Sequence, residues 1–343
     1  MATALFAPYS RRPAVVAAQI LLVAAAYYGS ARLGLLREVV VDGAVVTPLW
    51  LPTGVALSAL LYMGLRVWPG IAIGALFSIA TVGATLTPPG ATISAGNTLA
   101  PVFAFLMLRR VGFRPELDRL RDGVTLVFLG AAVAMLVSAS IGCGTLAVTG
   151  KLPLRDFWPV WLAWWAGDAM GVLVATPVLL VLRRIRLPRA TDRWPEATAL
   201  ALASVVVTLL ATRSTLTLLF LVFPLLIWAA LRFELSGSAP CACLASVLAV
   251  LAATEYIGPF EGRTLFEATL NVAVFNASVS LTALLLAAIV TEQKNIRSKI
   301  ELACLELADL VEQLAPGQVD LLPPPGDLPP SGDLPSPGGG PGR

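Results

Sequence analysis

Long apolar runs are the feature that most constrains how this chain of 343 residues folds. A helix needs about 20 predominantly apolar residues to cross the hydrocarbon core of a bilayer. The runs that we count as spans cover residues 14–36, 46–64, 67–86, 91–110, 123–149, 157–182, 196–212, 215–233, 237–257 and 266–290. We therefore predict an all-α, polytopic helical bundle in a membrane, with about ten transmembrane helices, or eight if the weakest pairs merge.

Composition supports membrane insertion and narrows the chemistry. Hydrophobic residues make up 57% of the chain, charged residues 13%, and the mean hydropathy is +0.82. The chain has no histidine, which excludes His-ligated haem, most zinc and copper sites, and nucleophiles that need a histidine base. Cys241 and Cys243 have no further soft ligands beside them, so we expect free thiols, no metal site and no cofactor.

The basic residues predict how the chain is oriented. If residues 1–12 form a cytoplasmic N-terminus, most of the 24 Lys and Arg residues fall in cytoplasmic segments, as the positive-inside rule requires. An even number of spans then leaves both termini in the cytoplasm. We interpret the basic clusters at 109–121 and 183–193 as orientation signals. The expected partner is therefore the lipid bilayer and not a nucleic acid.

One carboxylate lies deep within an apolar run, in the stretch WLAWWAGDAMGVLVATP at 161–177. Eleven residues separate Asp168 from Phe157, a distance of about 16 Å along a helix, which is close to the midplane of a core about 30 Å thick. An isolated charge at that depth is costly. We expect the carboxylate to be paired, hydrated in a cavity or protonated, and therefore to mark a binding or sensing site.

Aromatic and polar side chains at helical spacing, or on other spans, are candidates for a site around this carboxylate. The sensing candidates are Asp168, Asn97, Thr98, Trp161, Trp164, Trp165 and Arg32, and the further hydrogen-bonding candidates are Ser94, Asn271 and Asn276. The functional interpretation is an aromatic-walled site that opens to the outer face. The alternative is that the tryptophans form an interfacial belt and that Asp168 is a satisfied helix-packing residue.

Small residues predict where helices approach one another closely. Gly167 and Gly171 belong to a stripe of small residues beside Asp168, and a Gly-x-x-x-Gly pair recurs in the third span. The residues that we assign to helix packing are Gly167, Gly171, Pro177, Gly70 and Gly74.

A second pattern follows the last span, in residues 291–314. Apolar residues there recur at alternating spacings of four and three, which is the heptad seam of a coiled coil. The seam consists of Ile296, Ile300, Ala303, Leu307, Leu310 and Leu314. We predict a short cytoplasmic coiled-coil helix that supports a homodimer, with a surface amphipathic helix as the alternative. Residues 315–343 are rich in Pro and Gly, and we expect a disordered tail.

Three stretches resemble a known family. TPLWLPTGVALSALL (47–61), GNTLAPVFAFLMLRRVGF (96–113) and WLAWWAGDAMGVLVATPVLL (161–180) are similar, in this order, to the MASE1 family of bacterial membrane-associated sensor domains. The similarity covers about residues 10–300 and implies a sensor domain at 13–290. Ala100 departs from the pattern, because the family often has an acidic residue there. The matching positions are Trp50, Pro52, Gly54, Gly96, Asn97, Thr98, Leu99, Trp164, Trp165, Gly167, Asp168, Gly171 and Pro177.

The resemblance implies a sensory protein of the bacterial plasma membrane and adds Trp50 to the sensing candidates. Members of the family usually precede histidine-kinase, diguanylate-cyclase or phosphodiesterase modules. Because this chain ends where such a module would begin, we expect no enzymatic activity of its own and a separate kinase, cyclase or regulator as partner. The alternatives are a small secondary transporter that uses the buried carboxylate, and a degenerate fragment kept as a scaffold or dimerisation unit.

Overall fold

A computed structural model describes residues 13–36, 39–41, 44–83, 87–183, 194–216 and 218–314. The predicted cytoplasmic N-terminus at 1–12 and the predicted disordered tail at 315–343 lie outside the described residues. The chain divides into two compact units, Met1–Glu292 and Gln293–Arg343. The first unit contains the apolar helices and the second begins near the predicted coiled coil.

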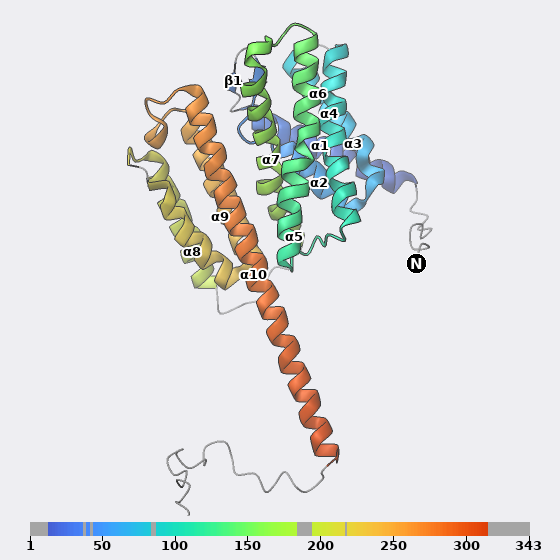
Figure 1. Cartoon of the computed structure of the whole chain (residues 1–343), viewed down its shortest axis with the longest axis vertical. Helices are drawn as coiled ribbons and strands as arrows, with labels where there is room; N and C mark the ends of the chain where they lie inside the picture. Colours follow the sequence, from blue (N-terminus) through green and yellow to red (C-terminus); the bar gives the residue numbers. More distant parts are fainter. Residues whose placement is uncertain are drawn as a thin grey trace, which may run out of the picture. The chain divides into compact units, whose positions relative to one another are not determined.

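The described residues are almost entirely helical (Figure 1). The long elements, in chain order, are α1 (Pro13–Leu35), α3 (Trp68–Gly83), α4 (Pro88–Arg110), the continuous run of α5 (Leu120–Thr125), η2 (Leu126–Val133) and α6 (Met135–Val148), then α7 (Phe157–Leu182), α8 (Trp194–Arg213), α9 (Val222–Thr254) and α10 (Leu265–Leu314). Eight of the described helices are long and apolar enough to cross a membrane. These findings confirm the predicted polytopic helical bundle.

The run predicted as one span at 46–64 is not one helix. It begins at the last residue of β2 (Ala44–Val46), which pairs antiparallel with β1 (Val39–Val41), and continues through a non-helical stretch into α2 (Leu51–Met63). Thirteen residues span only about 20 Å as a helix, less than the hydrocarbon core. Pro48 and Pro52 explain the late start, because proline is tolerated in the first turn of a helix but not in its interior.

Helix α2 runs parallel to the second half of α7. The Thr53 hydroxyl donates to the Asp168 carbonyl oxygen at 3.1 Å, and the Tyr62 hydroxyl, nine positions further along, donates to the Leu180 carbonyl oxygen at 2.8 Å. The guanidinium of Arg183 stacks 4.3 Å from the centre of the Tyr62 ring. The start of α2 is therefore at the level of Asp168, and its end is at the end of α7.

Helix α9 reverses its direction at Glu234, which has non-helical backbone angles (φ 54°, ψ −139°). Before the reversal, Arg232 donates to Glu196 in the first turn of α8 at 2.8 Å. After it, Gly258 packs against the backbone of Thr212 at the opposite end of α8. The predicted break between the spans 215–233 and 237–257 thus coincides with a turn between two antiparallel helical segments, both beside α8 (Figure 1).

Helix α10 begins in the first unit and packs there against α5, α7 and α9. The Ser238 hydroxyl of α9 donates to the Ala283 carbonyl oxygen at 3.1 Å, and the Leu120 amide of α5 donates to Glu292 at 2.9 Å. The same helix continues without interruption to Leu314. In the second unit, every side chain described from Gln293 to Val311 is exposed.

Candidate functional site

Asp168 lies in the middle of α7 and has no exposed surface. Eleven residues of α7 precede it, about 16 Å of helix. The helix is continuous here because its sequence has no proline between Pro159 and Pro177. A carboxylate is thereby placed far from either end of an otherwise apolar helix.

The segment before α2 packs directly on α7 beside this carboxylate. The Trp50 amide donates to the Gly167 carbonyl oxygen at 3.0 Å. A side chain on Gly167 would collide with the Thr47 carbonyl oxygen, and one on Gly171 would collide with the Trp50 carbonyl oxygen. Both glycines therefore lie where α7 closely approaches α2 and the non-helical segment before it.

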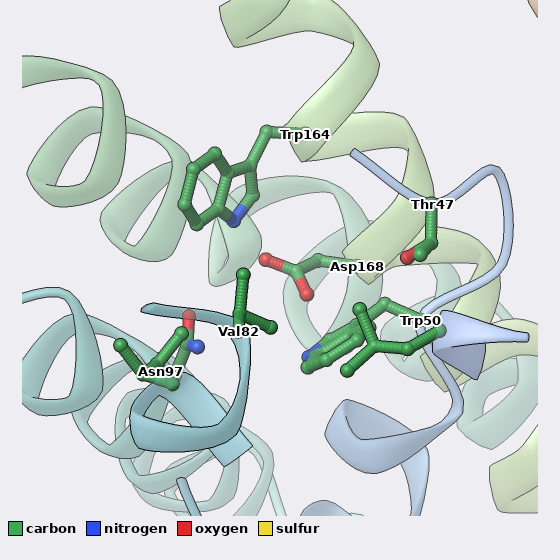
Figure 2. Close-up of a pocket in the computed structure, with 8 residues that line it drawn as sticks. Thr47, Trp50, Val82, Asn97, Trp164 and Asp168 are labelled. Carbon is green, nitrogen blue, oxygen red and sulfur yellow. The ribbon is translucent and has the colours of Figure 1, made fainter. Parts of the chain in front are cut away.

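A cavity of about 80 Å³ lies beside the carboxylate. It is lined by residues from α1, the segment before α2, α3, α4 and α7, namely Leu35, Thr47, Trp50, Ile79, Val82, Asn97, Trp164 and Asp168. Figure 2 shows Asp168 between the indole rings of Trp164 and Trp50, with Asn97 across the cavity. The volume is several times what one water molecule needs, so the cavity has room for a small ligand.

The carboxylate has little polar compensation. Neither oxygen of Asp168 has a hydrogen-bond partner of ordinary length among the described residues, and no described arginine or lysine forms an ion pair with it. Two neutral donors lie near the carboxylate, the Trp164 indole N–H and the Ser138 hydroxyl, and the latter donates to the Asn97 side-chain oxygen at 2.8 Å. An uncompensated carboxylate in an apolar interior is an energetic cost that functional sites tolerate more often than packing sites do.

The structure brings four of the predicted sensing residues to one cavity: Asp168, Asn97, Trp164 and Trp50. The two other tryptophans of α7 that were predicted as sensing residues do not line the cavity. The indole N–H of Trp165 donates to the Ala132 carbonyl oxygen at 2.8 Å, in the π-helical stretch η2, and that of Trp161 donates to the Ser140 hydroxyl at 3.2 Å. Trp161 also stacks edge-to-face on Trp158, with ring centres 5.9 Å apart.

The remaining predicted polar partners lie outside the cavity lining. Arg32 is exposed on α1. The Thr98 hydroxyl donates to the Ser94 carbonyl oxygen at 2.8 Å, and both residues line a separate groove between α3 and α4. In α10, the Asn271 amide donates to Glu267 at 2.8 Å, whereas Asn276 is buried with no hydrogen-bond partner among the described residues.

Sequence reasoning missed three residues of the site. Thr47 lines the cavity, and Ser138 holds Asn97 in place. Tyr27 of α1 is fully buried, its hydroxyl lies near the Trp50 indole N–H, and it lies within electrostatic range of Asp168. The signal available for Tyr27 was the pair of tyrosines, Tyr27 and Tyr28, in an otherwise aliphatic span; for Ser138 and Thr47 there was none.

The described residues contain no cluster of three or more His, Cys, Asp or Glu side chains that could hold a metal ion. The four cysteines are free thiols. A single carboxylate among indole and aliphatic groups lacks the oxygen ligands that calcium or magnesium needs. The arrangement can accept hydrogen bonds or positive charge at the carboxylate and can enclose a small molecule between aromatic rings.

Comparison with known proteins gives two matches. The family model MASE1 matches residues 1–294. A relative in Escherichia coli (strain K12), named probable diguanylate cyclase DgcE, is 30% identical over 208 residues, which cover 55% of this chain and 17% of that protein. The chain thus spans 17% of the length of this curated relative. No solved structure matches.

Proposed function

Because this chain belongs to the MASE1 family of membrane-associated sensor domains, we propose that it reads a signal at the Asp168 cavity and passes it along α10 to a signalling partner. The observation that carries the proposal is the buried carboxylate of Asp168, which faces a cavity and has no described hydrogen-bond partner within 3.5 Å and no described cation paired with it. A buried carboxylate that lacks a partner responds strongly to a ligand that supplies a hydrogen bond or a positive charge.

Helix α7 connects this site to α10. One face of α7, beyond Asp168, meets α9 and α10 around a cavity of about 10 Å³, lined by Leu173, Val174, Pro177, Leu235, Ala239, Ala242, Ser280, Ala283 and Leu284. Pro177 has no N–H, so the Leu173 carbonyl loses its helical donor. The Ser280 hydroxyl on the opposite wall has no partner among the described residues. The proline is a point at which α7 can bend directly against α10.

The continuation of α10 is the proposed output. Its residues in the second unit are exposed, including the predicted seam positions Ile296 and Ile300. Leu302 and Leu305 are exposed as well and lie off the seam, so the helix has apolar surface for a partner in addition to the proposed homodimer. The partner that we propose is a separate kinase, cyclase or regulator, and the relative named as a diguanylate cyclase favours the cyclase.

The orientation belongs to the same proposal. We propose that both termini lie in the cytoplasm of a bacterium and that the protein lies in its plasma membrane, which the distribution of Lys and Arg supports. The Asp168 cavity then lies toward the outer face, since it is lined by Leu35 and Val82 at the ends of α1 and α3.

Photo-crosslinking in native membranes tests the proposal. A photoreactive amino acid replaces Leu302 or Leu305 in the full-length chain, in the wild-type background and with Asp168→Asn. Captured proteins are identified by mass spectrometry. The matched control places the same amino acid at Leu202, an equally exposed position on α8.

We expect a kinase, cyclase or regulator to be captured from Leu302 or Leu305 but not from Leu202. The yield should change at least about threefold with Asp168→Asn, because the site and the helix are coupled. Capture of no signalling protein, or a yield that is the same in both backgrounds, contradicts the proposed function.

Transport is a second candidate, favoured by the discontinuous helix α2. Short helices that start near the midplane beside a charged group are typical of secondary transporters, and α2 starts at the level of Asp168. The test is proton flux into proteoliposomes that contain a trapped pH-sensitive dye. Flux that depends on Asp168, compared with Asp168→Asn, would favour transport, whereas equal flux in both would exclude it.

A further inference from the structure

We propose that the Asp168 cavity binds a small organic cation, of the alkylammonium or guanidinium class. The inference rests on the proposed sensory function of the same site and names the chemistry of its ligand.

The charge of Asp168 favours a cation as ligand. Asp168 has no exposed surface, and no described arginine or lysine pairs with it. The polar groups near its oxygens are neutral, the Ser138 hydroxyl and the Trp164 indole N–H, and neither forms a hydrogen bond with them within 3.5 Å. An ionised carboxylate in a low-dielectric interior is stabilised most by an opposite charge close to it. The cavity beside Asp168 is the space in which that charge can be held.

The wall of the cavity is largely aromatic and apolar. Two indole side chains, Trp50 and Trp164, lie on either side of the carboxylate (Figure 2), and Leu35, Ile79 and Val82 complete an apolar lining. Aromatic side chains around a carboxylate favour weakly hydrated organic cations, which gain from cation–π attraction and lose little hydration. Metal ions require several oxygen ligands, and the described part of the chain offers one carboxylate here.

The volume of the cavity limits the size of its ligand. The cavity measures about 80 Å³, roughly half of a cavity of about 150 Å³ that holds benzene. By that comparison it accommodates a molecule of roughly three heavy atoms. Methylammonium and guanidinium are close to this size, whereas tetramethylammonium, which is about as bulky as benzene, amino acids and nucleotides are larger.

The test is binding to the purified full-length protein in lipid nanodiscs, measured by calorimetry at constant ionic strength set with sodium chloride. The probes are methylammonium and guanidinium. The neutral counterpart is urea, which is close to guanidinium in shape but carries no charge. We expect saturable binding of at least one cation and none of urea.

Variants locate the binding. Asp168→Asn should weaken it by at least roughly 30-fold, because removing one partner of a buried charge pair leaves the other unpaired. Trp164→Phe should weaken it about threefold, since phenylalanine is the weaker cation–π partner. The matched control is Trp158→Phe, in which an exposed tryptophan outside the cavity changes in the same way and binding should be unchanged.

The wild-type comparison of guanidinium with urea needs no variant, so a misfolded Asp168→Asn protein does not block the test. No saturable cation binding, equal binding of urea, or cation binding unaffected by both cavity variants overturns the inference. The two proposals also fail separately. Cation binding with crosslinking that ignores Asp168 removes the sensory function alone, and Asp168-dependent crosslinking without cation binding removes the ligand class alone.

Discussion

Asp168 is a residue whose charge the surrounding structure does not compensate. Its two oxygens lack hydrogen-bond partners among the described residues, and its side chain is completely buried. Such a group lowers the stability of the empty protein and is retained where function requires it. A sensing carboxylate and a packing residue therefore differ in their effect on stability, because a packing residue stabilises the fold.

Asp168→Asn is therefore expected to raise the stability of the ligand-free protein, by about 1 kcal/mol, because asparagine keeps the shape and removes the charge. The measurement is thermal unfolding in detergent, with Asp156→Asn at the start of α7 as a control expected to change stability by less than about 0.5 kcal/mol. A clear decrease of the melting temperature in Asp168→Asn would mean that the carboxylate supports the fold.

Gly171 is the residue on which the approach of α2 to α7 depends most directly. A Cβ there would collide with the Trp50 carbonyl oxygen and lie 2.5 Å from the Thr53 hydroxyl oxygen. We expect Gly171→Ala to destabilise the protein by about 1–3 kcal/mol through overpacking. The matched control is Gly144→Ala in α6, where the added methyl group meets nothing within 4 Å and higher helix propensity gives a neutral or slightly stabilising change. Equal melting temperatures for the two variants would refute the close contact.

At the scale of elements, the reversal within α9 decides the topology of the C-terminal half. Both ends of α9 lie near the C-terminal end of α8, since η4 (Leu218–Leu221) follows α8 closely and Gly258 packs on Thr212. The turn at Glu234 lies near the other end of α8, where Arg232 meets Glu196. Taken as one continuous helix, α9 counts as a single span, and the non-helical backbone at Glu234 divides it into two.

We expect single cysteines at Thr215 and Tyr256 to be labelled by a membrane-impermeant thiol reagent from one side of the membrane, and a cysteine at Ser236 from the other. All three positions are exposed. The measurement compares right-side-out with inverted vesicles in a background in which exposed Cys304 is replaced by serine. Labelling of Ser236 and Tyr256 positions from the same side would show that α9 does not reverse.

At the scale of the whole molecule, the apolar helix beyond Glu292 has exposed Ile296, Ile300, Leu307 and Leu310 along its predicted seam. Two or three heptads associate weakly by themselves, so the proposed homodimer depends on the membrane bundle to bring two copies together. Because the proposed homodimer depends on the bundle, a change in the bundle would alter the spacing between the two copies of this helix.

Ile300→Cys is expected to form an intermolecular disulfide in oxidised membranes, because a seam position faces its counterpart in a parallel coiled coil. Ser298→Cys, which is exposed and off the seam, should remain monomeric, again with Cys304 replaced by serine. Denaturing gels without reductant measure the fraction of dimer. Equal crosslinking at both positions would indicate random collision, and none at Ile300 would contradict the parallel dimer.

The sequence by itself determined the fold class, most of the spans and the position of Asp168. Those properties are local: the length of an apolar run fixes whether a helix can cross the bilayer, and a carboxylate eleven residues into such a run is deep in any arrangement of helices. The break near Glu234 was visible for the same reason, because polar and small residues interrupt the hydropathy there. The family pattern added Trp50, which hydropathy does not single out.

Only the tertiary structure decided which residues surround the carboxylate. Trp161, Trp164 and Trp165 are equivalent by spacing, yet Trp164 alone of the three lines the cavity, because the neighbours of each ring are set by helices distant in sequence. Tyr27 and Ser138 reach the site from α1 and α6 for that reason. The non-helical segment that ends at Trp50, before α2 begins, likewise depends on contacts of its backbone with Gly167 and Gly171. Hydropathy is a property of one segment, whereas a site is a property of several segments packed together.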